Sequence, residues 1–347
     1  MRMLSAKQAV SPAAERTRQF LFHPFELATF LKLAAVACIS EGFGFNISFA
    51  TSRRFVSNID VSQPLHLSSE MINLMALAVV ALAAFCVIVF YLISCFRFVF
   101  FHCAAYQTTE IRPVWNRYRP QAIRFFNAGL LVWIVFAIFA SGIVFPFAKR
   151  FLSLVRQTGT GVQIDSSNLL FSIIPLFVIL PALGVTALVV DVVLHDFILP
   201  HMALEDASFG AAWKAARGHI AAGIGSFLLY CLLRLLLPLL TLVFLLIVAG
   251  IPMLLIFGAL SVSANGFLMM IDDPTPLGMV FHTGFQILFV AMAFALGLMV
   301  EFGLGGPVAT WVRNYALLYY GGRYKALGDL LSATVTQPAL NDAPETA

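Results

Sequence analysis

The sequence predicts an all-α fold, a polytopic transmembrane bundle of six helices with amphipathic helices along its cytoplasmic face. Composition is the first reason: 61% of the 347 residues are hydrophobic and 11% are charged, whereas soluble chains are about 45–50% apolar and about 25% charged. The mean hydropathy of +0.92 agrees. The second reason is that the apolar residues form runs of about 20, the length that a helix needs to cross a bilayer.

Six runs reach that length, and each predicts one membrane-spanning helix. The first carries Lys32 and Glu41 near its ends, and the fourth contains Pro175 and Pro181, which should bend it. Residues 251–262 are too few to cross alone, so they either extend the fifth helix or lie in the interface. The predicted spans are residues 25–45, 71–96, 125–148, 169–190, 221–249 and 279–302.

The basic residues outside these runs predict the orientation. One side would hold Arg2, Lys7, Arg16, Arg18, Arg97, Arg112, Arg117, Arg119, Arg124, Lys214, Arg217, Arg313, Arg323 and Lys325. The other would hold only Arg53, Arg54, Lys149, Arg150 and Arg156. Because short cytoplasmic loops collect Lys and Arg, we expect a multi-pass protein of the inner (cytoplasmic) cell membrane with both termini in the cytoplasm. A seven-helix alternative would place the C-terminal basic residues outside.

The chain ends are polar and predict disordered cytoplasmic tails at residues 1–19 and 331–347, flanking one transmembrane domain at 20–330. A cleaved signal peptide is not expected, because no separate apolar region precedes the first run.

Three basic segments on the predicted cytoplasmic side also contain aromatic residues, a combination that suits the lipid headgroup layer. In residues 209–220, Phe209, Trp213, Ala216 and Ile220 share one helical face, and Asp206 or Ser208 is placed to cap its start. Residues 307–319 repeat the arrangement, and residues 111–126 do so less regularly. Specific lipid recognition and ordinary anchoring both remain open. The predicted lipid contacts are Trp115, Arg117, Arg119, Trp213, Lys214, Arg217, Trp311, Arg313 and Tyr315.

Two segments of the chain, each of which runs from the end of a predicted span into one of these basic segments, resemble each other. The segment FVFFHCAAYQTTEIRPVW from Phe98 aligns with FILPHMALEDASFGAAW from Phe197, with Phe, His and Trp in register to within one residue. This pattern suggests a parallel internal repeat of the kind found in transporter folds.

Ionisable side chains in or near the spans predict a polar pocket open to the cytoplasm. Arg234 is the deepest, about 20 Å into the fifth run and thus near the middle of a hydrocarbon core about 30 Å thick. We expect an acidic partner for it, either Asp191 or Glu301. The alternative is a structural ion pair with charges at the helix ends. The pocket residues would be Lys32, Arg97, Asp191, His195, Asp196, Arg234 and Glu301.

No catalytic, metal-binding or cofactor-binding pattern is recognised in the sequence. Asp191 and His195 are spaced to share a metal ion and His201 follows, but a third ligand is not evident. The five cysteines lie in or beside apolar runs without a CxxC pair, so we expect reduced packing residues. A formal charge of +4 does not suggest a nucleic-acid partner.

Three passages resemble a known group of proteins: RFVFFHCAAYQTTEIRPVW, DFILPHMALEDASFGAAW and PVATWVRNYALLYYGG. They are similar to uncharacterised six-span membrane families related to the membrane domain that accompanies some glycerophosphodiester phosphodiesterases. The family pattern Phe-x-x-Pro before an Ala-Trp helix matches Phe197, Pro200, Ala212 and Trp213. Its terminal Arg-x-Tyr-x-Leu element matches Arg313, Tyr315 and Leu317. The resemblance implies the topology and no activity, since the phosphodiesterase half is not present.

Together these patterns favour a non-enzymatic membrane component that binds or organises lipid, a partner membrane protein or a second copy of itself. The first alternative is a transporter or permease with a cytoplasm-facing pocket around Arg234. The second is an intramembrane enzyme, which would require Asp191, His195 and His201 to lie together.

Overall fold

The computed structural model describes residues 4–23, 25–41, 69–158, 166–252, 255, 258 and 276–341. These residues form helices and no β-strand, so the predicted all-α class is confirmed. The chain divides into two compact units. Unit 1 comprises Met1–Phe45, Val99–Ile111 and Gly223–Ala347, and unit 2 comprises Asn46–Phe98 and Arg112–Ala222.

Five helical stretches in the described part of the chain are long and apolar enough to cross a membrane. They correspond to the second to sixth predicted spans. The first predicted span is represented by α2 (Leu27–Glu41), which is about 22 Å long at 1.5 Å per residue. Residues 42–45 and most of residues 251–262 lie outside the described residues. The five stretches are Asn73–Tyr106, Ile111–Arg150, Ile174–Leu204, Ile224–Thr241 and Thr283–Gly321.

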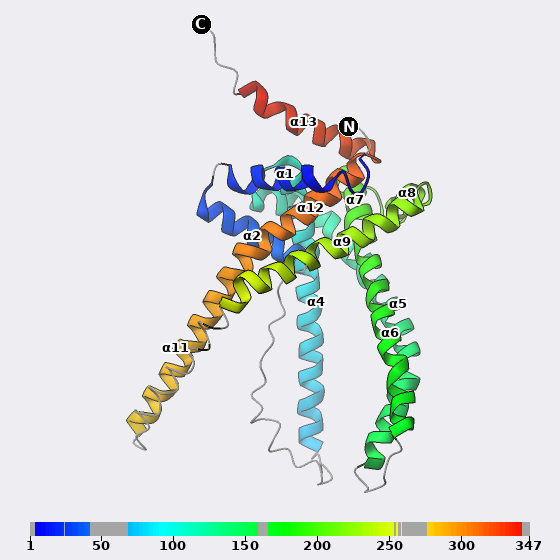
Figure 1. Cartoon of the computed structure of the whole chain (residues 1–347), viewed down its shortest axis with the longest axis vertical. Coiled ribbons are helices and arrows are strands. Elements are labelled where there is room, and N and C mark those ends of the chain that lie inside the picture. Colours follow the sequence, from blue (N-terminus) through cyan, green and yellow to red (C-terminus); the bar gives the residue numbers. More distant parts are fainter. Residues whose placement is uncertain are drawn as a thin grey trace. The chain divides into compact units, whose positions relative to one another are not determined.

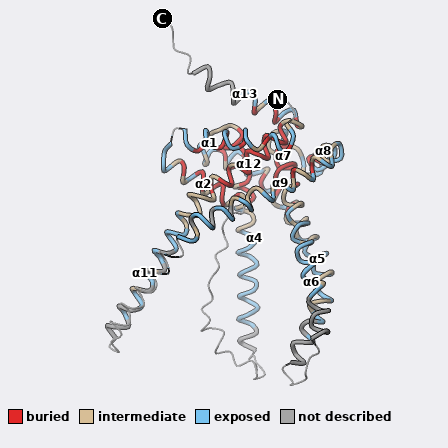
Figure 2. The backbone as a smooth tube through the Cα atoms, in the orientation of Figure 1, coloured by how far each residue is buried: buried red, intermediate tan, exposed pale blue. Residues whose placement is uncertain are grey.

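Unit 1 is built around α12 (Gly306–Gly321), which packs against α1, α2, α9 and α13. These helices surround α12 in Figure 1, and Figure 2 shows α12 as buried along most of its length. A helix covered on all sides is expected to be mainly apolar or small, and α12 does contain several Ala, Val and Leu residues. The remaining elements of unit 1 are α1 (Val10–Phe22), the end of α4 (Ser69–Tyr106), α9 (Ile224–Leu245), η2 (Leu246–Gly250), α11 (Pro276–Val300), η3 (Glu301–Gly305) and α13 (Lys325–Asn341).

The N-terminal segment is not the disordered tail that we expected. It forms α1, in which Arg16 is buried and donates hydrogen bonds to the carbonyl oxygens of Ala104 and Ala105, at 3.1 and 2.9 Å. These are among the last carbonyls of α4, which have no partner within their own helix. Burial lowers the pKa of Arg16 to about 10, so its guanidinium is still charged at neutral pH and suits these acceptors.

The C-terminal segment also corrects our expectation of disorder from residue 331. Helix α13 continues to Asn341, and it is held on unit 1 by the buried side chains of Leu327 and Leu331. Polar composition misled the prediction because these two leucines near the start of the helix are enough to attach it. Residues 342–347 lie outside the described residues.

We also expected the aromatic side chains of α12 to contact lipid at the membrane surface, whereas this helix is buried among the other helices of unit 1. Gly306 explains why it enters the interior instead: a Cβ at this position would lie 2.3 Å from the Cβ of Ala34 in α2. Glycine therefore lets the two helix backbones approach closely, which small residues commonly do in membrane bundles. The aromatic side chains of α12 then fill the core of unit 1.

Unit 2 contains the residues of α4 up to Phe98, then α5 (Ile111–Thr158), α6 (Ser166–Val192), η1 (Val193–Ile198), α7 (Leu199–Leu204) and α8 (Phe209–Ala221). The basic segment at residues 111–126, which we expected to be a less regular surface helix, forms the first turns of α5, with Pro120 inside the helix. Phe98 of α4 contacts the rings of Tyr118 and Phe125 in α5. These aromatic contacts hold the two helices together.

The two hairpins of the predicted repeat share a backbone feature. Gln107 and Asp206 have φ angles of 53° and 50°, the only positive values among the described non-glycine residues. In the alignment that pairs Phe98 with Phe197, these two residues occupy the same position. This local conformation is a structural landmark in favour of the repeat, independent of the three side chains used to align the segments.

Candidate functional site

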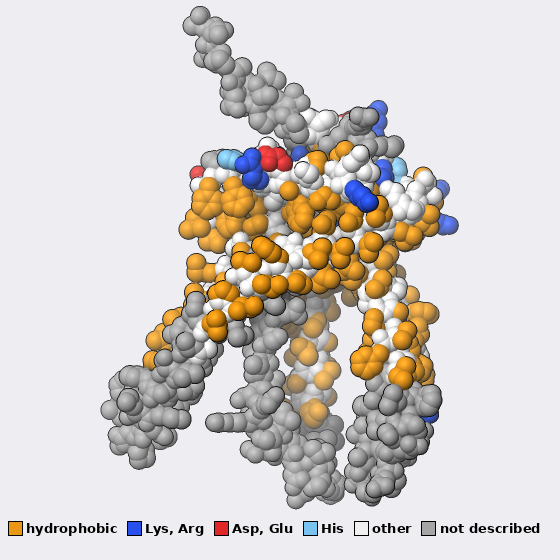
Figure 3. All heavy atoms as spheres, in the orientation of Figure 1, with side chains coloured by type: hydrophobic (Ala, Val, Ile, Leu, Met, Phe, Trp, Pro, Cys, Tyr) orange, Lys and Arg blue, Asp and Glu red, His pale blue; other side chains and the backbone are white. Residues whose placement is uncertain are grey.

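Unit 2 presents exposed basic side chains at one end of its apolar helices. We define the basic surface as Arg112, Arg117, Arg119, Lys214 and Arg217, all of them exposed. The guanidinium of Arg117 lies 5.7 Å from the ring centre of Tyr118. In Figure 3, blue basic side chains gather where α8 lies, and orange apolar side chains cover the described length of the long helices. The basic surface therefore places exposed positive charges at the end of long helices whose sides are apolar.

Helix α8 is held on unit 2 by two alanines, of which only Ala216 belongs to the predicted apolar face. Ser208 caps its start by accepting a hydrogen bond from the backbone N–H of Ala211, as one of our two alternatives predicted. Ala212 and Ala216 are the buried residues of this helix. Trp213, which we expected to share the face of Ala216, is 47% exposed. Its indole therefore lies on the outside beside Lys214.

Two aromatic side chains of α5, between the arginines of the basic surface, pack into the protein. The ring of Trp115 contacts Phe96 of α4 edge-on, with 5.1 Å between centroids. Tyr118 is buried. Arg124 forms an ion pair with Asp206, which connects α5 to the turn that precedes α8. Arg124 is therefore engaged within the protein and is not part of the basic surface.

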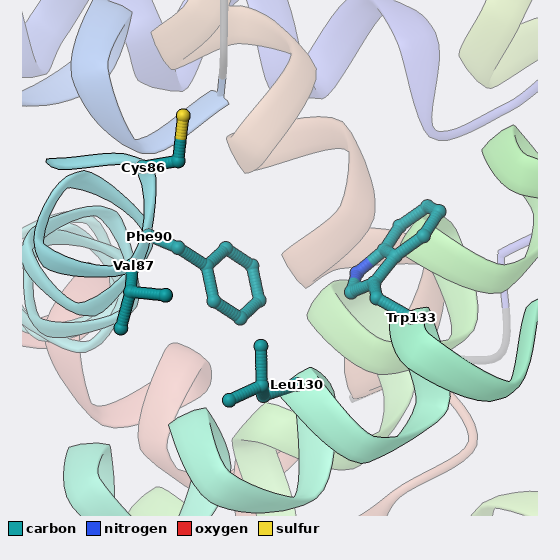
Figure 4. Close-up of a pocket in the computed structure, with 5 residues that line it drawn as sticks. All are labelled: Cys86, Val87, Phe90, Leu130 and Trp133. Carbon is teal, nitrogen blue, oxygen red and sulfur yellow. The ribbon is translucent and has the colours of Figure 1, made fainter. Parts of the chain in front are cut away.

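An apolar pocket of about 350 Å³ lies between α4 and α5. Its lining residues are Cys86, Val87 and Phe90 of α4 and Leu130 and Trp133 of α5. Figure 4 shows the Phe90 ring between the two helices, facing Leu130 and Trp133. None of these five residues belongs to the polar pocket that we predicted, so this cavity differs from the expected one in chemistry.

The predicted pocket residues of unit 2 comprise one partly buried ion pair and two buried side chains of η1. Arg97 and Asp191 make an ion pair with 2.8 Å between Nη2 and Oδ1. His195 and Asp196 are buried within η1. Such π-helical insertions are frequent at functional sites. His201 lies against Glu205 and stacks on His219 at 6.2 Å, and the described residues hold no cluster of three metal-ligating side chains.

The predicted pocket residues of unit 1 are arranged differently from our expectation. Arg234 has an acidic partner, but that partner is Glu41, whose side chain is 2% exposed, and not Asp191 or Glu301. Glu301 begins η3, and its backbone oxygen accepts a hydrogen bond from the Cys38 thiol. Lys32 is exposed on α2. Glu41 was missed because we assigned it to the end of a span, although a carboxylate in an apolar run is itself a signal.

Three predicted lipid contacts lie within unit 1. Arg313 and Tyr315 are 0% and 1% exposed, which corrects our expectation that they contact headgroups. The Arg313 guanidinium lies 5.3 Å from the ring centre of Phe101, and Tyr315 stacks on Tyr230. Trp311 is half-buried and donates a hydrogen bond to the carbonyl of Val10. Burial, which the helical periodicity of the sequence does not reveal, removes these side chains from the surface.

These features define a multi-pass α-helical membrane protein with a basic, aromatic surface and buried ion pairs. The chain belongs to a family of unknown function (DUF7544), whose model matches residues 4–330. No curated protein and no solved structure matches the chain. The predicted membrane family of unknown function is therefore confirmed in its general terms, and the relation to glycerophosphodiester phosphodiesterases stays a prediction.

Proposed function

We propose that the protein is a non-enzymatic component of the cell membrane that binds anionic lipid headgroups through the basic surface of unit 2. In this proposal the basic surface faces the cytoplasm, as the distribution of Lys and Arg predicts. The observation that carries the proposal is the exposure of five basic side chains at one end of helices whose shafts are apolar.

Physical chemistry favours lipid phosphate as the ligand of this surface. The planar guanidinium group binds phosphate through two parallel hydrogen bonds, and Arg117 and Arg119 of α5 are both exposed and accessible to a ligand. Each basic side chain near an anionic membrane surface contributes about 1 kcal/mol. The exposed indole of Trp213 suits the adjoining boundary between headgroups and acyl chains.

A lipid titration of the purified protein tests this proposal. The protein in a neutral detergent would be mixed with phosphatidylglycerol or phosphatidylcholine, and bound lipids would be counted by native mass spectrometry. We expect wild-type protein to bind more phosphatidylglycerol. The double variant Lys214→Gln/Arg217→Gln should lose part of this preference, about fivefold in affinity for each contact removed.

The chain offers a matched control. Lys149 and Arg150 are the same pair of residue types, also exposed, at the other end of α5. The variant Lys149→Gln/Arg150→Gln should keep the preference of the wild type for phosphatidylglycerol. Equal binding of both lipids by the wild type, or an equal loss in both double variants, would overturn the proposal.

The ion pair of Arg234 and Glu41 supports transport as a second proposal. Charged side chains within membrane-spanning segments commonly mark a substrate or ion path. Arg234 and Glu41 lie on two helices of unit 1. Uptake into proteoliposomes that is lost in Arg234→Leu, with the folded protein retained, would favour a permease. Uptake equal to that of empty vesicles would count against it.

A further inference from the structure

The pocket between α4 and α5 has the chemistry of an acyl-chain site. We propose that it holds one fatty-acyl chain of a bound phospholipid, whose phosphate lies on Arg119. The proposal rests on the proposed function and deepens it, because it turns a general attraction for anionic headgroups into a site for a whole lipid molecule.

The lining and surroundings of the pocket select a hydrocarbon occupant. Four of its five side chains are aliphatic or aromatic, and the fifth is the thiol of Cys86. Both helices are membrane-spanning candidates. Val87 at the pocket is 45% exposed, and Leu131 and Ile134, which directly follow lining residues in α5, are 63% and 47% exposed. Exposed side chains on the membrane-spanning part of a helix contact acyl chains, since water is excluded from the membrane interior.

Arg119 stands at the right place for the phosphate of the same lipid. It precedes Leu130 in α5 by about three helical turns, so both residues lie on one side of the helix, about 16 Å apart along its axis. An acyl chain extends through half of the hydrocarbon core, or about 15 Å. Arg119 is exposed, and it lies one helical turn after Trp115, whose ring contacts Phe96 of α4. It is therefore beside the same pair of helices as the pocket.

The test varies the length of the lipid chain and the volume of the pocket. Native mass spectrometry would compare the binding of dipalmitoyl and dihexanoyl phosphatidylglycerol to the detergent-purified full chain. The variant Leu130→Trp fills the pocket from α5, and Val87→Trp fills it from α4. The control Ile138→Trp adds the same ring at a position that is 67% exposed on α5. Thermal melting would establish that each variant is folded.

We expect wild-type protein and Ile138→Trp to favour the long-chain lipid. The pocket variants should bind the long-chain lipid roughly tenfold more weakly, because the chain loses the contacts of about two methylene groups. They should still prefer phosphatidylglycerol to phosphatidylcholine. Arg119→Gln should weaken that headgroup preference and leave the dependence on chain length intact.

The outcomes separate this proposal from the proposed function. Long-chain binding that is unchanged in both Leu130→Trp and Val87→Trp would overturn the acyl-chain site and leave the headgroup surface standing. A chain-length effect that the pocket variants abolish, in a protein with no preference for phosphatidylglycerol, would overturn the headgroup surface and support the acyl-chain site. An equal loss of long-chain binding in Ile138→Trp would show that the pocket is not the site.

Discussion

Gln107 and Asp206 adopt the same left-handed backbone conformation at matching positions of two hairpins. Gln107 directly follows α4, which ends at Tyr106, and Asp206 follows the C-cap of α7 at Glu205. A helix commonly ends with a residue in this conformation, and glycine usually supplies it because other side chains are strained there. In both of these hairpins a non-glycine residue adopts this strained conformation.

Replacing Gln107 with glycine should therefore maintain or increase stability, by up to about 1 kcal/mol, whereas Gln107→Val should reduce it by about 1–2 kcal/mol. Thermal unfolding in detergent measures both effects. The control is Gln19→Gly, because Gln19 is exposed inside α1 and the same change there should cost about 1 kcal/mol. Equal losses in the two glycine variants would contradict the strain at Gln107.

The close approach of α2 and α12 predicts that Gly306→Ala is destabilising by about 1–3 kcal/mol, because the new methyl group would overlap Ala34. The compensating variant Ala34→Gly/Gly306→Ala should recover part of this loss. Gly303→Ala is the matched control, since nothing lies within 4 Å of a Cβ at that position. Melting temperatures that fall equally for Gly303→Ala and Gly306→Ala would contradict the close helix crossing.

The ion pair of Arg234 and Glu41 predicts strong non-additivity. Arg234→Leu or Glu41→Leu alone leaves an uncompensated buried charge and should cost about 3–5 kcal/mol, whereas the double variant should approach the wild type. A double-mutant cycle of unfolding free energies measures the coupling. Costs that simply add would mean that the two charges are not paired. If uptake is detected, the folded double variant also separates a role in transport from a role in stability.

The proposed orientation predicts that Lys214 and Lys149 face opposite compartments. Both residues are exposed, on α8 and near the far end of α5. In intact cells, a membrane-impermeant maleimide should label Lys149→Cys and should label Lys214→Cys only after permeabilisation. Wild-type protein, with its own five cysteines, is the control. Labelling of both positions from the same compartment would refute the six-span orientation.

Long apolar runs made the helical class and five membrane-spanning stretches predictable from the sequence. A run of about 20 apolar residues has one stable solution in lipid, because its backbone must satisfy its own hydrogen bonds. The N-terminal cap of α8 was also predictable from the sequence, since Ser208 was one of the two residues predicted to cap this helix. These features depend on residues close together in the chain.

Features that depend on distant partners were not predictable. The pattern of α12 is the same for a helix at the membrane surface and for one buried on all sides, and Gly306 decides between them only through Ala34. The choice of Glu41 as the partner of Arg234 likewise depends on packing. The tail prediction failed because polar residues such as Arg16 find acceptors that lie far along the chain.

Helix α1 and the residues just before it are joined to the C-terminal part of the chain by three hydrogen bonds: Trp311 to Val10, Asn314 to Thr17 and Arg323 to Leu4. A ribosome synthesises α1 first and α12 almost last. Helix α1 can therefore be enclosed only after nearly the whole polypeptide has been made. Synthesis of unit 2 is complete by Ala222, well before that moment. Unit 2 can therefore assemble during translation, whereas unit 1 closes only when its final helices have emerged.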